Sequence, residues 1–130
     1  MNETIFPAGN KVESENFFGQ VWLEMLSSAD DTFHCPIYNV TFAPGARNSW
    51  HKHPGGQILL VTSGIGWYQE EGKPAQAIQT GDVVRIKPDI KHWHGASADK
   101  QMAHIGITTN PDKGDAEWLE PVSNEEYSKL

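Results

Sequence analysis

The chain has 130 residues, of which 38% are hydrophobic, and 17 acidic residues against 10 Lys and Arg give a formal net charge of −7. This length and apolar content suit one folded domain and exclude a disordered chain. The acidic balance argues against nucleic acid or an anionic membrane as a partner, which leaves a small-molecule substrate. No run approaches the roughly 20 apolar residues of a membrane helix, and no signal peptide is recognisable, so we expect a cytoplasmic protein.

Short β-rich runs separated by turn residues fill most of the chain. Residues 1–16 are mostly polar and are expected to form an N-terminal arm, whereas residues 17–130 form one domain. Because the runs leave no room for helical crossovers, they predict an all-β sandwich or barrel. Turn residues such as Ser63-Gly64 separate the runs, and Ser123-Asn124-Glu125-Glu126 has a capping-box pattern that predicts a short C-terminal helix. The predicted strands are Gln20–Leu26, Ile37–Phe42, Gln57–Ser63, Gly66–Glu70, Ala75–Ile78, Asp82–Ile86 and Met102–Thr108.

Five of the six histidines are grouped: His51 with His53, His92 with His94, and His104 further along the chain. Residues two apart on a strand point to one face, so each pair can present two imidazoles to the same point. Neutral imidazole is the commonest metal ligand, and a site needs three or four donors that converge within roughly 2.0–2.3 Å of the ion. One such pair alone would favour a solvated strand face, whereas two pairs favour a metal site.

Gln57 follows His53 by four residues, after a turn that contains Gly55 and Gly56. Because glycine adopts backbone angles that other residues avoid, the chain can reverse there and return the carboxamide oxygen of Gln57 to the same ion. The single cysteine, Cys35, excludes an internal disulfide and any cysteine-based zinc cluster.

These residues carry a resemblance to a known family. The stretch from Gly45 through the His51 pair to Gln57, closed by Gly64, resembles the first cupin motif, with Gln57 where the common motif has Glu. The stretch from Gly81 through Pro88 resembles the second motif, which places His92 in the ligand position. His94, two residues later, offers a competing donor.

The resemblance extends over Thr41–Ile107 and the tail at Glu117–Val122, which are similar to small bacterial cupins related to carboxymuconolactone decarboxylase-associated cupins. That group includes manganese-dependent hydroxynitrile lyases. The resemblance implies a small antiparallel β-barrel, or jelly roll, and one divalent transition metal. It further implies four ligands, and His104 as the base. The implied metal ligands are His51, His53, Gln57 and His92.

Three imidazoles and one amide are all neutral, so such a complex keeps the full 2+ charge of its ion and is a strong Lewis acid. Nitrogen donors favour Mn(II), Fe(II), Co(II), Ni(II) or Zn(II) over Mg(II) or Ca(II). The resemblance favours manganese among them. His94 and His104 are candidates for moving a proton, because imidazole titrates near neutral pH.

Three functions are compatible with such a site. The first is a metal-dependent lyase like the hydroxynitrile lyases, the second is a dioxygenase-type cupin, and the third is a cupin that binds a small molecule without chemistry.

Family members usually cover open barrel edges with another subunit, which predicts a homodimer or homotetramer. Tyr38 is assigned to the core or to the pocket mouth, and alternation assigns Trp93 to packing or to a dimer interface.

Overall fold

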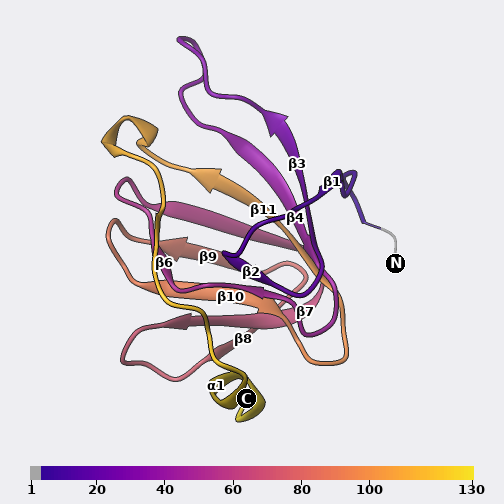
Figure 1. Ribbon diagram of the computed structural model, residues 1–130. Coiled ribbons are helices and arrows are strands. Elements are labelled where there is room, and N and C mark those ends of the chain that lie inside the picture. The colour runs from indigo at the N-terminus through magenta and orange to yellow at the C-terminus, as the bar shows by residue number, and fades with distance from the viewer. Residues whose placement is uncertain (1–3) are drawn as a thin grey trace.

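The computed structural model describes residues 4–130, which form an antiparallel sheet that curls over itself as a small barrel (Figure 1). The first three residues of the predicted arm, 1–3, lie outside the described residues. In spatial order the main strands are β1 (Asn10–Lys11), β3 (Val21–Ser27), β4 (Ile37–Phe42), β11 (Met102–Thr108), β7 (Gln57–Glu70), β10 (His92–Ala96), β5 (Arg47–Asn48) and β2 (Phe17–Phe18). The remaining elements are β6 (His51–Lys52), β8 (Gln76–Gln79), β9 (Val83–Ile86), β12 (Glu117–Trp118), the 3-10 turn η1 (Pro111–Lys113) and α1 (Asn124–Ser128). None of the helices in the described part has the length and apolar content needed to cross a membrane.

The central strand β7 belongs to both halves of the barrel. Its first part pairs with β11 and β9, and its second part pairs with β10 and β8. The sequence predicts two strands here with a turn at Ser63-Gly64, and this prediction is wrong. Gly64 takes a positive φ of 78°, and the β7–β11 register shifts opposite Ala103 and His104, so the strand bends without ending.

The other predicted strands are confirmed closely. Ile37–Phe42 and Met102–Thr108 match β4 and β11 to the residue, and Gln20–Leu26 is shifted by one residue from β3. The strands β1, β2, β5, β6 and β12 are only two residues long, which is too short for an alternating pattern to reveal. The predicted C-terminal helix is also confirmed: the hydroxyl of Ser123 accepts from the backbone N–H of Glu126, whose side chain accepts from the backbone N–H of Ser123.

Apolar side chains from both halves fill much of the barrel interior. Each large side chain that is fully buried contributes about 1.5–3 kcal/mol to folding. Phe42 belongs to this core, and its ring centroid lies 5.9 Å from that of His94 and 5.6 Å from that of His104, so the core borders the histidines. The buried members are Val21, Val40, Phe42, Ala46, Leu59, Val61, Tyr68, Ile78, Val84, Ile86, Ala96 and Met102.

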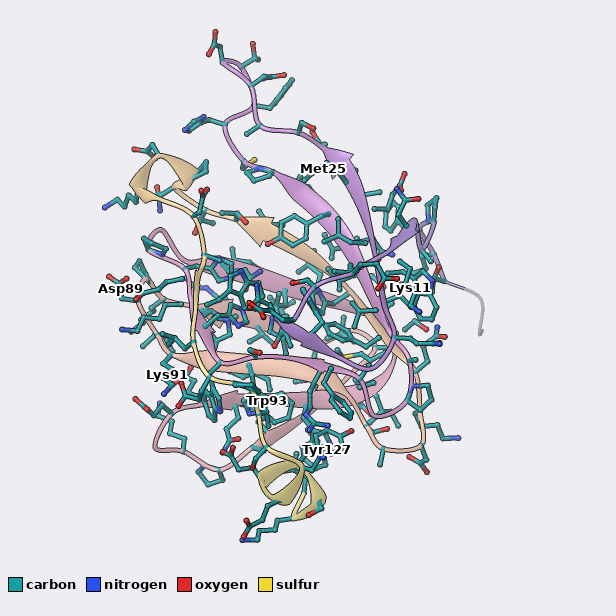
Figure 2. The ribbon with its side chains drawn as sticks, in the orientation of Figure 1. Lys11, Met25, Asp89, Lys91, Trp93 and Tyr127 are labelled. Atoms are coloured by element: carbon teal, nitrogen blue, oxygen red, sulfur yellow. The ribbon has the colours of Figure 1, made fainter. Side chains whose placement is uncertain are left out.

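Trp93 faces away from this interior, because it alternates with His92 and His94 along β10. It is only 1% exposed and packs with Trp50 and Tyr127 in a second apolar cluster. Figure 2 shows Trp93 and Tyr127 between the sheet and α1. The tryptophan is therefore used for packing within the chain.

Arg47 and Tyr127 fasten the C-terminal segment to the barrel. The Arg47 guanidinium donates to the carbonyl of Val122 at 3.0 Å and to Oδ1 of Asn124 at 2.8 Å, and Tyr127 donates its hydroxyl to the carbonyl of Ala96 at 2.6 Å. In Figure 1 this segment crosses the front of the barrel before it reaches α1. The preceding strand, β12, pairs with β6 and so comes close to the histidines.

The bend in β7 predicts an unequal response to two glycine substitutions. Gly64 and Gly72 both have positive φ, but a Cβ at Gly64 would collide with the backbone oxygen of Gln101, whereas a Cβ at Gly72 meets nothing within 4 Å. We expect Gly64→Ala to lower the free energy of unfolding by about 3 kcal/mol or more, and Gly72→Ala by about 1 kcal/mol. Urea denaturation followed by tryptophan fluorescence measures both, and equal losses would contradict the steric explanation.

Candidate metal centre

Three histidines, from the neighbouring strands β6 and β10 and from the residue after β6, meet inside the barrel. His51 in β6 lies directly opposite His92 in β10, and their ring centroids are 4.2 Å apart. His53 lies two residues beyond His51, on the same side of the chain, with its ring centroid 5.1 Å from that of His51. One ring nitrogen from each of the three lies within 4.8 Å of the others, a spacing on the order of that between donors around one cation.

Backbone carbonyls determine which ring nitrogen of two histidines is free. Nδ1 of His51 lies 2.8 Å from the carbonyl oxygen of Ser49, and Nδ1 of His92 lies 2.8 Å from that of Ile90. Because a carbonyl only accepts, both Nδ1 atoms carry the proton and both Nε2 atoms keep a lone pair. Nε2 of His92 and Nε2 of His53 are buried with no hydrogen-bond partner among residues 4–130.

Gln57 offers a fourth buried acceptor. Its Nε2 donates to the hydroxyl of Tyr38 at 2.7 Å, and its Oε1 is buried with no hydrogen-bond partner in the described part of the chain. An unpaired buried acceptor costs about 1–3 kcal/mol unless a ligand binds it. Gln57 lines the same cavity as His51 and His53. These orphaned acceptors are the atoms that a metal ion would satisfy.

Burial keeps these imidazoles uncharged. Desolvation, followed by repulsion from a charged His92, lowers the pKa of His53 to about 4, and desolvation lowers the pKa of His92 to about 4 as well. The same causes, desolvation first, bring the pKa of His51 well below its usual value. All three rings are thus neutral at neutral pH and available as ligands, so the residues present fit a divalent transition metal.

His94 and His104 form a second histidine pair beside the first group. Nδ1 of His94 lies 3.1 Å from Nε2 of His104, so one ring donates a hydrogen bond to the other. His94 also donates its backbone N–H to Oδ1 of Asn48 at 2.9 Å, and the Asn48 Nδ2 lies 3.3 Å from both ring nitrogens. Burial lowers the pKa of both imidazoles, that of His104 to about 4. His94 is absent from the group of three, which contains His92 instead.

A cavity of about 120 Å³ joins the two groups of histidines. Among the residues that the structure describes, its lining contains no Lys, Arg, Asp or Glu. Phe17 from β2 and Trp118 from β12 lie across it with ring centroids 5.5 Å apart, and the Trp118 ring centroid is 4.7 Å from that of His51. The lining residues are Phe17, Leu23, Tyr38, Val40, Asn48, His51, His53, Gln57, His94, His104 and Trp118.

Sequence reasoning did not assign Asn48, Phe17 or Trp118 to the site. All three lie on two-residue strands, where periodicity gives no signal. The sequence assigns Tyr38 to the core or to the pocket mouth, and its side chain lines the cavity. Its hydroxyl forms hydrogen bonds with Gln57 and Thr108.

The fold and the histidine geometry agree with comparisons to known proteins. A family model described as a cupin domain matches residues 38–108, which include all five clustered histidines and Gln57. The chain belongs to the cupin family. The resemblance seen in the two sequence motifs is thereby confirmed, while the assignment of individual metal ligands stays a prediction.

Two relatives resemble this cupin over nearly its whole length. A protein named (R)-mandelonitrile lyase from Granulicella tundricola is 42% identical over 122 residues, which cover 94% of this chain and 93% of the relative. The crystal structure of a cupin-like protein from Thermotoga maritima is 52% identical with a TM-score of 0.93, and the match covers 98% of this chain and 96% of that one.

A more distant solved structure shows the fold alone. The cupin-2 domain protein from Rhodospirillum rubrum has a TM-score of 0.75 at 16% identity, with 99% of this chain and 85% of that chain covered. The barrel fold is therefore shared with a protein whose amino-acid sequence is largely different.

The orphaned ring nitrogens predict that one substitution removes bound metal. We expect His92→Ala to weaken Mn(II) binding by at least about 100-fold, because loss of a direct ligand exceeds the 10–100-fold effect of losing an outer hydrogen bond. His34→Ala is the control, since His34 is exposed on a loop and its nearest charged partner, Asp112, is 3.8 Å away. Elemental analysis and chelator competition measure both variants, and equal metal contents would contradict the assigned site.

Proposed function

We propose that this cupin is a metal-dependent lyase that cleaves or forms a carbon–carbon bond in a small, neutral hydroxyl compound of the cyanohydrin type. One observation carries the proposal: a hydrogen-bonded histidine pair, His94 and His104, borders a cavity that three of the four candidate metal ligands also line. Such a cavity combines a place for a cation with groups that can move a proton. The 42% identity to a mandelonitrile lyase supports the same class of reaction.

The lining of the cavity supports an uncharged substrate. A carboxylate or ammonium group in this cavity would lose its hydration without gaining an oppositely charged side chain, which is costly in an apolar environment. The nearest buried cation in the barrel wall, Arg47, is bonded to the C-terminal segment and does not line the cavity. A neutral hydroxynitrile, aldehyde or ketone meets these conditions.

The residues divide into two tasks. A divalent cation held by His51, His53, Gln57 and His92 would polarise the substrate oxygen and stabilise negative charge on it. His104, hydrogen bonded to His94, takes the hydroxyl proton while the carbon–carbon bond to the nitrile breaks and its electron pair leaves on the cyanide carbon. The proton then returns to cyanide, so one cyanohydrin gives one carbonyl compound and one HCN.

We propose Mn(II) as the resident ion, on the resemblance to manganese-dependent lyases. Nitrogen-rich donor sets also accept Fe(II), Co(II), Ni(II) and Zn(II). The neutral donors leave the ion its full charge, which suits Lewis-acid chemistry.

Cyanide release tests the proposed reaction. We expect the manganese-loaded protein to release cyanide from mandelonitrile, and His104→Ala to lower kcat by about 10²–10⁴-fold, the range for loss of a general base. His104→Ala should retain its metal, whereas His51→Ala should lose both metal and activity. If the wild type gives no more cyanide than His51→Ala, this activity is excluded, and oxygen uptake by the iron-loaded protein with an enediol would favour the dioxygenase alternative.

The aromatic pair across the cavity predicts a change in selectivity. Trp118→Ala removes a ring beside His51 and opens the wall, so we expect kcat/KM for a small cyanohydrin to fall by about 10–200-fold relative to a bulkier one. Phe33→Ala is the matched control, because Phe33 is 65% exposed and lies outside the cavity. Competition between two cyanohydrins in one assay measures the ratio, and an unchanged ratio in Trp118→Ala would show that the ring does not contact substrate.

A further inference from the structure

We propose that Tyr38 and Thr108 form a positioning pair that holds the Gln57 carboxamide with Oε1 toward the histidines. The inference rests on the proposed metal site and adds two residues that act through a ligand. Both residues lie within the family match at residues 38–108, but neither belongs to the two cupin motifs between Gly45 and Gly64 and between Gly81 and His92.

Gln57, Tyr38 and Thr108 form a short chain of hydrogen bonds. Nε2 of Gln57 is 2.7 Å from the Tyr38 hydroxyl oxygen, which is 2.9 Å from Oγ1 of Thr108. Because an amide nitrogen only donates, the tyrosine oxygen accepts from Gln57. The hydroxyl hydrogen of Tyr38 is then free to be donated to Thr108, and this arrangement satisfies both polar atoms of the tyrosine hydroxyl.

The reverse orientation of the amide exchanges the roles in these hydrogen bonds. With the carboxamide turned over, the Tyr38 hydroxyl would donate to Oε1 of Gln57 and accept from Thr108, whose hydroxyl can take either role. The amide N–H groups would then lie where Oε1 is now buried with no hydrogen-bond partner among the described residues. An N–H group cannot bind a cation, so a turned amide removes the fourth donor. A glutamate would need no such control, since its two oxygens are equivalent.

The strand register holds this pair in place. Thr108 lies opposite Gln57 across β11 and β7, and Gly106 lies opposite Tyr38 across β11 and β4. A Cβ on Gly106 would collide with the Tyr38 ring, so the ring lies directly over the glycine. The three interacting residues thus come from three adjacent strands in the wall of the barrel, and little freedom remains for the tyrosine.

A double-mutant cycle on metal affinity tests the inference. We expect Tyr38→Phe to weaken Mn(II) binding by about 10–100-fold in the wild-type background, the usual effect of losing an outer hydrogen bond to a ligand. In the Gln57→Glu background we expect Tyr38→Phe to weaken binding by less than about 10-fold, because either carboxylate oxygen can bind the ion and only the outer hydrogen bond is lost. Chelator competition gives the affinities, and the Mn(II) electron paramagnetic resonance spectrum should change on Tyr38→Phe only when Gln57 is present.

Two further variants make the test independent of a packing defect. Thr108→Val keeps the shape of the side chain but frees the Tyr38 hydrogen to attract Oε1 of Gln57, so this variant should also weaken metal binding. Tyr127→Phe is the control, because it removes a tyrosine hydroxyl that is bonded to Ala96 on the outer side of the sheet. Its metal affinity should equal that of the wild type.

The outcomes separate the inference from the proposed function. A wild-type protein that binds no divalent metal overturns both the metal site and the positioning pair. Wild-type affinity in Tyr38→Phe and Thr108→Val, with normal metal binding in the parent, overturns the positioning pair alone. Equal losses from Tyr38→Phe in the wild-type and Gln57→Glu backgrounds also overturn it, because they would show that the tyrosine acts on stability and not on the amide.

Discussion

The direct pairing of His51 with His92 across β6 and β10 is the contact on which the site depends. It brings two imidazoles from separate stretches of chain close together, with their rings tilted, and His53 joins them from just beyond β6. Because side chains alternate between the faces of a strand, a slip of one residue in this register would turn His92 outward and Trp93 inward. The burial of Trp93 under the C-terminal segment opposes that slip, so the outer cluster helps to maintain the inner one.

Hydrogen bonding gives the histidine cluster its chemical character. Carbonyl oxygens bind Nδ1 of His51 and of His92, which leaves a lone pair on each Nε2, and Nε2 of His92 has no hydrogen-bond partner among the described residues. A fold that leaves several buried acceptors unsatisfied in one place is costly for stability unless a cation binds there. Neutral donors, an apolar cavity and the neighbouring His94–His104 pair then favour chemistry on an uncharged substrate through charge stabilisation and proton movement.

Two short strands, one near each end of the described chain, complete the cavity. Phe17 arrives on β2 and Trp118 on β12, and their rings contact each other over the histidines. Arg47 and Tyr127 hold the C-terminal segment in place through hydrogen bonds to the barrel. The wall of the cavity can therefore change through these segments while the candidate donors on and beside β6, β7 and β10 stay the same.

The amino-acid sequence alone determined the all-β class, the C-terminal helix and the candidate donors, because alternation, turn residues and His-x-His spacing are local properties of the chain. It left open whether His92 or His94 joins the first histidine pair, and it placed a turn where β7 continues through Gly64. Only the tertiary structure decided that His92 joins His51 and His53, that Phe17 and Trp118 close the cavity, and that Tyr38 binds Gln57. These features come from pairing between residues distant in sequence, and such register depends on the whole barrel and not on any local pattern.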